Sequence, residues 1–183
     1  MATDDDIKIY LDACCYIDLV QHQNNLSIEK GRDNHIWYCR RFLDAARAKD
    51  IKVYGSTLLV AECTAVRDDN RKRIINDEVK SSFKAILLSG NPVIPVQPMP
   101  KILDIARSFS WDYELNMRAL DAIHVATAVM LNCNAFITTD GPLTNIVNNS
   151  KHKLSIKAGT AEVFKEYLPT KYRQETLELR GKK

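Results

Sequence analysis

Short apolar runs alternate with segments of helical period along the chain. Buried strands are predicted for three runs rich in β-branched and aromatic residues, at 7–12 (IKIYLD), 51–56 (IKVYGS) and 134–140 (NAFITTD), and for a fourth at 154–158 (LSIKA). From Asp33 to Lys49, apolar residues recur at every third or fourth position, which predicts an amphipathic helix. This alternation of strands and helices indicates an α/β architecture.

The rest of the pattern predicts further elements around these strands. Ser56 or Thr57 is a suitable cap for a helix over 58–66, and the polar run 67–73 then interrupts or exposes the chain. A helix at 121–131 has almost no polar face, so it should be buried on every side. The other predictions are helices at 74–88, 100–109 and 160–168, the last ending at Pro169, and an edge strand or extended connection between prolines at 92–98.

Composition and charge limit the class of protein. With 183 residues and 45% hydrophobic content, the chain can bury one sizeable core, so we expect one domain at 1–168 and a basic tail at 169–183 that accounts for the net charge of +3. The five cysteines show no C-x-x-C spacing, which argues against a disulfide framework and a zinc site. The acidic N-terminus lacks the features of a signal peptide, and no run approaches the roughly 20 apolar residues that span a bilayer. We therefore expect a cytoplasmic protein without membrane association.

Two aspartates directly follow predicted strands. Asp12 and Asp140 each end one, and in open parallel sheets ligands bind beyond the carboxyl ends of the strands. Thr138 shares a strand face with Asp140, so its hydroxyl can orient a carboxylate or a water there. Both aspartates have a structural alternative, because Asp commonly starts turns and Asp140 precedes Gly141-Pro142.

Two further acids lie in apolar helical surroundings. The neighbours of Glu62 one turn away on its predicted helix are all apolar, namely Leu58, Leu59, Ala65 and Val66. The alternative for Glu62 is a position at the edge of this stripe, from which it reaches water. Asp121 begins the apolar helix, where capping is its alternative role. His124 lies three residues on and is better explained as a hydrogen-bonded core residue than as a catalyst.

Asp12, Glu62, Asp121 and Asp140 together form an unusual set. Four carboxylates near one edge of a sheet do not all stay ionised without help, because like charges raise one another's pKa values. A divalent cation supplies that help, and oxygen ligands without a His or Cys set favour Mg²⁺ or Mn²⁺ over zinc. Such a site is suited to hydrolysis of phosphodiester bonds, because the metal activates a water and neutralises charge on the phosphate.

The sequence resembles the PIN-domain family of metal-dependent ribonucleases, which includes the VapC-type toxins of toxin–antitoxin pairs. The matching stretches are IYLDACCYIDLV with Asp12, LLVAEC with Glu62, RALDAIHVATA with Asp121, and FITTD with Asp140 and Thr138. The resemblance implies a single α/β domain with a central parallel sheet flanked by helices on both faces. It also implies a Mg²⁺ or Mn²⁺ site and endonucleolytic cleavage of RNA. A protein antitoxin and a homodimer are expected from the family alone.

Two other functions are the alternatives to this hypothesis. The family has a Ser, Thr or Asn shortly after the first acid, where this chain has Ala13, Cys14 and Cys15. A module of the same fold that has lost turnover and binds RNA or a protein partner is therefore the main alternative. Retention of all four acids argues against it. An aspartyl-nucleophile phosphatase is set aside, because that chemistry needs a second Asp at position 14.

The RNA-binding surface has only weak signals in the sequence. The basic runs Arg71 to Arg73 and Arg40-Arg41 are candidates for phosphate contacts. The aromatic candidates for base stacking are Trp37, Tyr38, Trp111 and Tyr113. The structural alternatives are that the charges form a solvated surface and that Trp37 packs on its own helix.

Overall fold

Five parallel strands form the central sheet of the computed structural model, which describes residues 7–173. Their order across the sheet is β5-β2-β1-β6-β7, and every neighbouring pair is parallel. The strands are β1 (Lys8–Leu11), β2 (Lys52–Ser56), β5 (Val93–Val96), β6 (Ala135–Ile137) and β7 (Ala158–Gly159). The predicted strand at 92–98 is thus an edge strand, as its prolines require.

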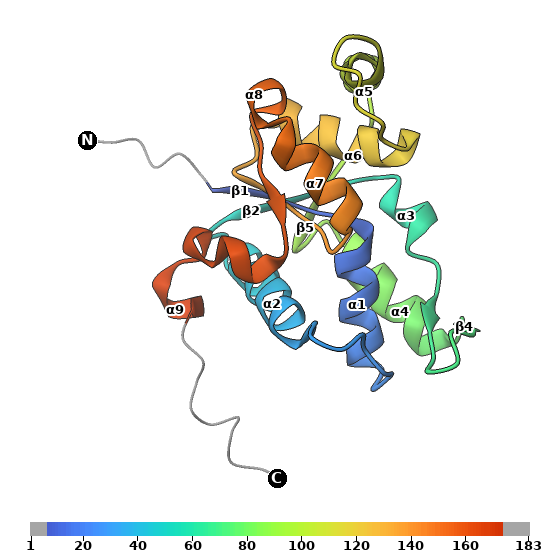
Figure 1. Cartoon of the computed structure of the whole chain (residues 1–183). Coiled ribbons are helices and arrows are strands. Elements are labelled where there is room, and N and C mark those ends of the chain that lie inside the picture. Colours follow the sequence, from blue (N-terminus) through green and yellow to red (C-terminus); the bar gives the residue numbers. More distant parts are fainter. Residues whose placement is uncertain (1–6, 174–183) are drawn as a thin grey trace.

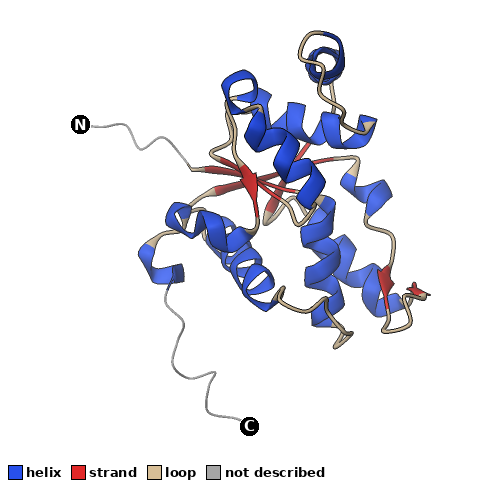
Figure 2. Cartoon of the chain, in the orientation of Figure 1, coloured by secondary structure: helices blue, strands red, loops and turns tan. Residues whose placement is uncertain are grey.

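Helices cover both faces of this sheet (Figures 1 and 2). On one face lie α1 (Ala13–Gln23), α2 (Asp33–Arg47), α4 (Asp77–Leu87), the 3₁₀ helix η1 (Ala161–Tyr167) and α9 (Thr170–Arg173). On the other face lie α5 (Pro100–Trp111), α6 (Ala119–Met130), α7 (Gly141–Asn149) and α8 (Lys151–Leu154). The predicted α/β fold, a central parallel sheet with helices on both faces, is confirmed.

The sheet separates two hydrophobic cores, because successive side chains of a strand point to opposite faces. Ile9 and Leu11 of β1 are fully buried against α1, α2 and α4. Tyr10 between them is also fully buried, but it packs with Phe136 against α5, α6 and α7. After Lys8, strand β1 is therefore buried on both faces, and Asp12 is the first residue beyond it.

The segment after β2 differs from its prediction. Helix α3 (Leu59–Glu62) ends at Glu62 instead of continuing to residue 66, and the chain then forms the antiparallel hairpin of β3 (Val66–Arg67) and β4 (Arg73–Ile74). The polar run 67–73 supplies the turn of this hairpin, because the Asp68 carboxylate accepts hydrogen bonds from two backbone N–H groups within it. The helical pattern continued across a segment that is extended in the fold.

Three other predicted elements also differ from the structure. The predicted strand 154–158 begins as the last residue of α8, and only Ala158 and Gly159 pair with β6, because Ser155 adopts a left-handed conformation with φ 52°. The helix predicted at 160–168 is a 3₁₀ helix. Helix α6 begins at Ala119, so Asp121 lies in its first turn and Arg118 is the N-cap residue.

The basic tail lies mostly outside the described residues. Its first part forms α9, where Lys171 and Tyr172 contact Asp50 at 2.7 and 2.8 Å. The proposed boundary between a domain at 1–168 and a tail at 169–183 stays a prediction. Within residues 7–173, no helix has the length and apolar character needed to cross a membrane.

Candidate active site

Asp12 and Asp140 begin helices at the carboxyl ends of adjacent strands. Asp12 is the N-cap residue of α1, and its Oδ1 accepts the Ala13 N–H at 2.8 Å. Asp140 caps α7 in the same way, since its Oδ1 accepts the Leu143 N–H at 2.9 Å. The structural alternative predicted for both aspartates was a turn, whereas in the structure each caps a helix with only one oxygen of its carboxylate.

The Thr138 hydroxyl connects these two aspartates. It is fully buried, donates to Asp12 Oδ2 at 2.8 Å and accepts the Asp140 backbone N–H at 3.1 Å. Because β6 is paired with β1, Thr138 lies beside the end of β1 although 126 residues separate it from Asp12. The predicted orienting role of Thr138 therefore has a specific geometry around Asp12.

Asp121 joins this group through Arg118. The guanidinium Nε lies 3.2 Å from Asp121 Oδ2, and Nη2 lies 3.3 Å from Asp140 Oδ2. Partial burial raises the pKa of Asp121 most, and the charges of Asp12 and Asp140 raise it further, while Arg118 lowers it. Three of the four predicted acids are thus close enough to influence one another.

Glu62 is oriented by a relay of hydrogen bonds through the buried side chains of His124 and Tyr10. Its Oε2 lies 2.6 Å from His124 Nε2, and His124 Nδ1 lies 2.6 Å from the Tyr10 hydroxyl. That hydroxyl accepts the Ser56 N–H at 2.8 Å, and burial raises the pKa of Tyr10, so the phenol keeps its proton. The phenol then donates to Nδ1, which leaves Nε2 of a neutral imidazole as the donor to Glu62. His124 is a buried, hydrogen-bonded residue, as its sequence context predicted.

Cys14 lies in the segment after Asp12 where the sequence resemblance predicted a Ser, Thr or Asn. Its Sγ is 3.5 Å from Asp12 Oδ2 and 3.4 Å from Thr138 Oγ1, and it accepts the Thr139 N–H at 3.2 Å. The pKa of Cys14 is raised, first by its hydrogen bond with Cys15 and then by burial, so it stays a neutral thiol. A weak thiol contact thus supports Asp12 in addition to the stronger Thr138 hydroxyl.

The donors around these acids fit a hard dication better than a soft one. Carboxylate and hydroxyl oxygens converge from β1, β6 and α6, and a cationic guanidinium already bridges Asp121 and Asp140. Across the described part of the chain, however, the acids do not form a group whose ligand atoms all lie within 4.8 Å of one another. A shared ion would therefore require rearrangement of these side chains.

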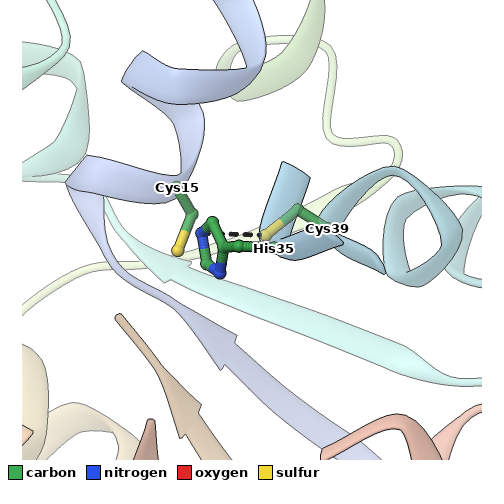
Figure 3. Close-up of side chains that lie close together, drawn as sticks. All are labelled: Cys15, His35 and Cys39. Atoms are coloured by element: carbon green, nitrogen blue, oxygen red, sulfur yellow. Dashed lines mark hydrogen bonds between the residues drawn. The ribbon is translucent and has the colours of Figure 1, made fainter. Parts of the chain in front are cut away.

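A group with that spacing does exist elsewhere, and the sequence did not predict it. Cys15 of α1 meets His35 and Cys39 of α2 in the core (Figure 3). His35 Nδ1 accepts the Ala161 N–H at 3.0 Å, so Nε2 carries the ring proton and faces Cys39 Sγ at 3.4 Å. A metal would need the Nε2 lone pair, and this tautomer does not offer it. The arrangement is that of a hydrogen-bonded core.

Glu62 also lines an open cavity of about 1000 Å³. Its walls include Arg67, Arg71 and Arg73 of the hairpin, which places one of the predicted basic runs on the same cavity as Glu62. The second run is engaged elsewhere, since Arg40 contacts His22 at 2.7 Å and Arg41 lies over the ring of Trp37.

The aromatic candidates are divided between the two faces of the sheet. Trp37 packs edge-on against Tyr38 on α2, which agrees with its structural alternative. Trp111 is 71% exposed at the end of α5 with Arg107 over its ring, and Tyr113 stacks on Phe109. These positions leave the RNA-binding surface a prediction.

Replacing Asp121 with Asn should stabilise the protein at neutral pH without added metal. A carboxyl whose folded pKa is raised is destabilising when ionised, so removing the charge should raise the melting temperature. The gain should be no more than about 1–2 °C, because substitutions outside the core usually change stability by less than about 0.5 kcal/mol. The gain should shrink on acidification, because the wild-type carboxyl is then neutral too. Asp104→Asn on exposed α5 is the matched control in thermal unfolding. A lower melting temperature for Asp121→Asn at pH 7.5 would contradict the assignment.

His35 should make the fold sensitive to mild acid. Burial is the main cause that lowers the pKa of His35 below 6.5, so its stabilising contribution is complete above pH 6.5 and is lost as the pH falls through the lower folded value. We expect the melting temperature of the wild type to fall as the pH falls below 6.5. The free energy of unfolding should decrease by up to about 1.4 kcal/mol per pH unit from this one proton. His35→Gln should flatten that dependence, whereas His152→Gln at an exposed position should keep it. Equal acid sensitivity in all three proteins would exclude His35 as the source.

Comparison with known proteins identifies the family of the chain. A family model described as PIN domain matches residues 9–147, a span that includes Asp12, Glu62, Asp121 and Asp140. A search of curated proteins finds no match. The match covers most of the chain, and the chain therefore belongs to the PIN domain family.

Proposed function

We propose that the protein is a Mg²⁺- or Mn²⁺-dependent endoribonuclease. Membership of the PIN domain family supports a nuclease-type function in general. The observation that carries the specific proposal is the linkage of three acids from separate elements, by Thr138 between Asp12 and Asp140 and by Arg118 between Asp140 and Asp121. A purely structural role would not require such a concentration of charge at one edge of the sheet.

Each residue has a distinct part in this proposal. Asp12, Asp121 and Asp140 would hold the metal, because each has an oxygen that is not used for helix capping. The bound ion would lower the pKa of a water and neutralise charge on the phosphate. Glu62, kept in one orientation by His124, would be a further ligand or the base that positions the attacking water.

A more specific biological role rests on the resemblance alone. VapC-type toxins form pairs with an antitoxin, and the proposal extends to this chain as the toxin of such a pair, acting in the cytoplasm. A protein antitoxin and a homodimer belong to the same hypothesis. Co-purification from a host that expresses the neighbouring gene would test this part independently of catalysis.

The alternative is a module that binds RNA or a protein without turning it over. Two observations favour it: the thiol of Cys14 is a weaker partner for Asp12 than a hydroxyl, and Arg118 already engages Asp121 and Asp140. Tight binding of RNA that yields no products in Mn²⁺ would support this function over the first.

Asp12→Asn should abolish cleavage while the fold survives. Asn can still accept the Ala13 N–H and cap α1, so the change removes the charge and the acceptor of the Thr138 hydroxyl while the helix cap is kept. We expect cleavage of a fluorescent single-stranded RNA in Mn²⁺ to fall by at least about 100-fold, because a bound metal contributes several kcal/mol to such reactions. Asp104→Asn, which removes an exposed charge of α5, should cleave like the wild type. Full activity of Asp12→Asn, or of the wild type in excess chelator, would refute the proposal.

Tyr10→Phe should disturb Glu62 without touching it. The change leaves Ser56 N–H and His124 Nδ1 without their buried partner, so it should cost about 1–3 kcal/mol of stability. If Glu62 acts on the water, kcat should fall about 10-fold while KM stays within a factor of two, as is typical for loss of an orienting partner. The Nε2–H signal of His124 in a ¹⁵N NMR spectrum should weaken or shift in parallel.

Tyr54→Phe on β2 is the matched control, since it removes a phenol that is not part of this relay. An unchanged kcat in a Tyr10→Phe protein whose His124 tautomer has changed would remove Glu62 orientation from the proposal.

A further inference from the structure

Arg118 contacts two of the four acids, and its position is unusual. It is the N-cap residue of α6 but makes no side-chain capping bond. Its side chain is 80% exposed and still reaches Asp121 in its own helix and Asp140 after β6, at 3.2 and 3.3 Å. The guanidinium thus ties together two elements of the sheet edge while most of it stays in water.

The oxygens that Arg118 contacts differ from those used elsewhere in the site. Asp12 Oδ1 and Asp140 Oδ1 accept backbone N–H groups of helix termini, and Asp12 Oδ2 accepts the Thr138 hydroxyl. These donors are fixed by the fold. Arg118 contacts Oδ2 of both Asp121 and Asp140, so its donors are the ones in this group that a side-chain rotation can withdraw.

Charge and exposure decide how easily Arg118 can leave. Exposed ion pairs contribute little to stability because water screens them and because ordering a long side chain costs entropy. A divalent cation carries twice the charge and binds directly to the same oxygens. The two cations cannot share both oxygens at ligand distance, so occupancy by one excludes the other.

We propose that Arg118 is a displaceable counter-ion that competes with the divalent metal for Asp121 and Asp140. It offsets the repulsion between the acids until an ion binds, and it must withdraw from both carboxylates for the ion to enter. Arg118 thereby sets the metal concentration at which the site fills. Once released, its guanidinium lies at the rim of the site, where a phosphate group of the RNA is the natural acceptor. The inference rests on the proposed metal site.

Mn²⁺ binding measured by isothermal titration calorimetry tests the competition without substrate. Arg118→Gln should bind Mn²⁺ roughly 3- to 10-fold more tightly than the wild type, the gain expected from removing two exposed ion pairs. Arg47→Gln is the matched control, because Arg47 is also exposed and forms an ion pair with Asp44 on α2. It should bind Mn²⁺ like the wild type, which excludes a general effect of net charge.

Unchanged or weaker Mn²⁺ binding by Arg118→Gln, with normal binding by the wild type, would overturn the competition and leave the proposed nuclease intact. An absence of Mn²⁺ binding in the wild type and in Arg118→Gln would overturn the metal site itself. The two failures are therefore distinguishable.

A second measurement follows the guanidinium directly. The Nε–H signal of Arg118, assigned by its loss in Arg118→Gln, should move and exchange faster with solvent as Mg²⁺ is added, because its contact with Asp121 is lost. A signal that stays unchanged while the backbone amide of Asp121 responds to saturating Mg²⁺ would show that the ion enters beside Arg118, and the proposal would fail.

Discussion

Repulsion between carboxylates at one edge of the sheet is the constraint on which this site depends. A parallel sheet brings the ends of β1 and β6 together, and after each of these strands an aspartate begins the next helix. The fold offsets the resulting charge with helix N-termini, which present N–H groups to Asp12 and Asp140, and with the Thr138 hydroxyl between them. The same donors that begin α1 and α7 therefore also make the acidic edge tolerable.

Asp121 is not stabilised in this way. It lies inside the first turn of α6, it is partly buried, and its raised pKa reflects the neighbouring acids as well as burial. Its recorded partner is the exposed guanidinium of Arg118. Asp121 is therefore the member of the group whose charge is least well compensated by the fold and most in need of a cation from outside. This imbalance links the stability of the protein to the occupancy of the site.

Sequence patterns located the acids because each stands in a context that ordinary structure explains poorly. Asp12 directly follows three buried strand residues, and Glu62 lies in an apolar stretch of sequence; these are local signals, although the helix of Glu62 ends at that residue. Arg118 had no such signal, because an arginine before a helix is common and its second partner lies 22 residues away. The sequence also did not predict the group of Cys15, His35 and Cys39, because spacing along the chain does not show that α1 and α2 pack together. The end of α3 was missed because the helical pattern continued across a segment that tertiary pairing makes extended.

The Tyr10 relay shows how the two layers of the fold meet at the site. Tyr10 points into the core opposite to that of Ile9 and Leu11, and from there its hydroxyl receives a backbone donor from β2 and orients a ring on α6. His124 then delivers a single N–H to Glu62, which α3 brings from a third element. Because Tyr10 and His124 are both buried and hydrogen-bonded, they fix the orientation of Glu62. An acid fixed in this way suits the positioning of a water molecule, whereas Asp121 and Asp140, joined by one exposed guanidinium, suit the exchange of one cation for another.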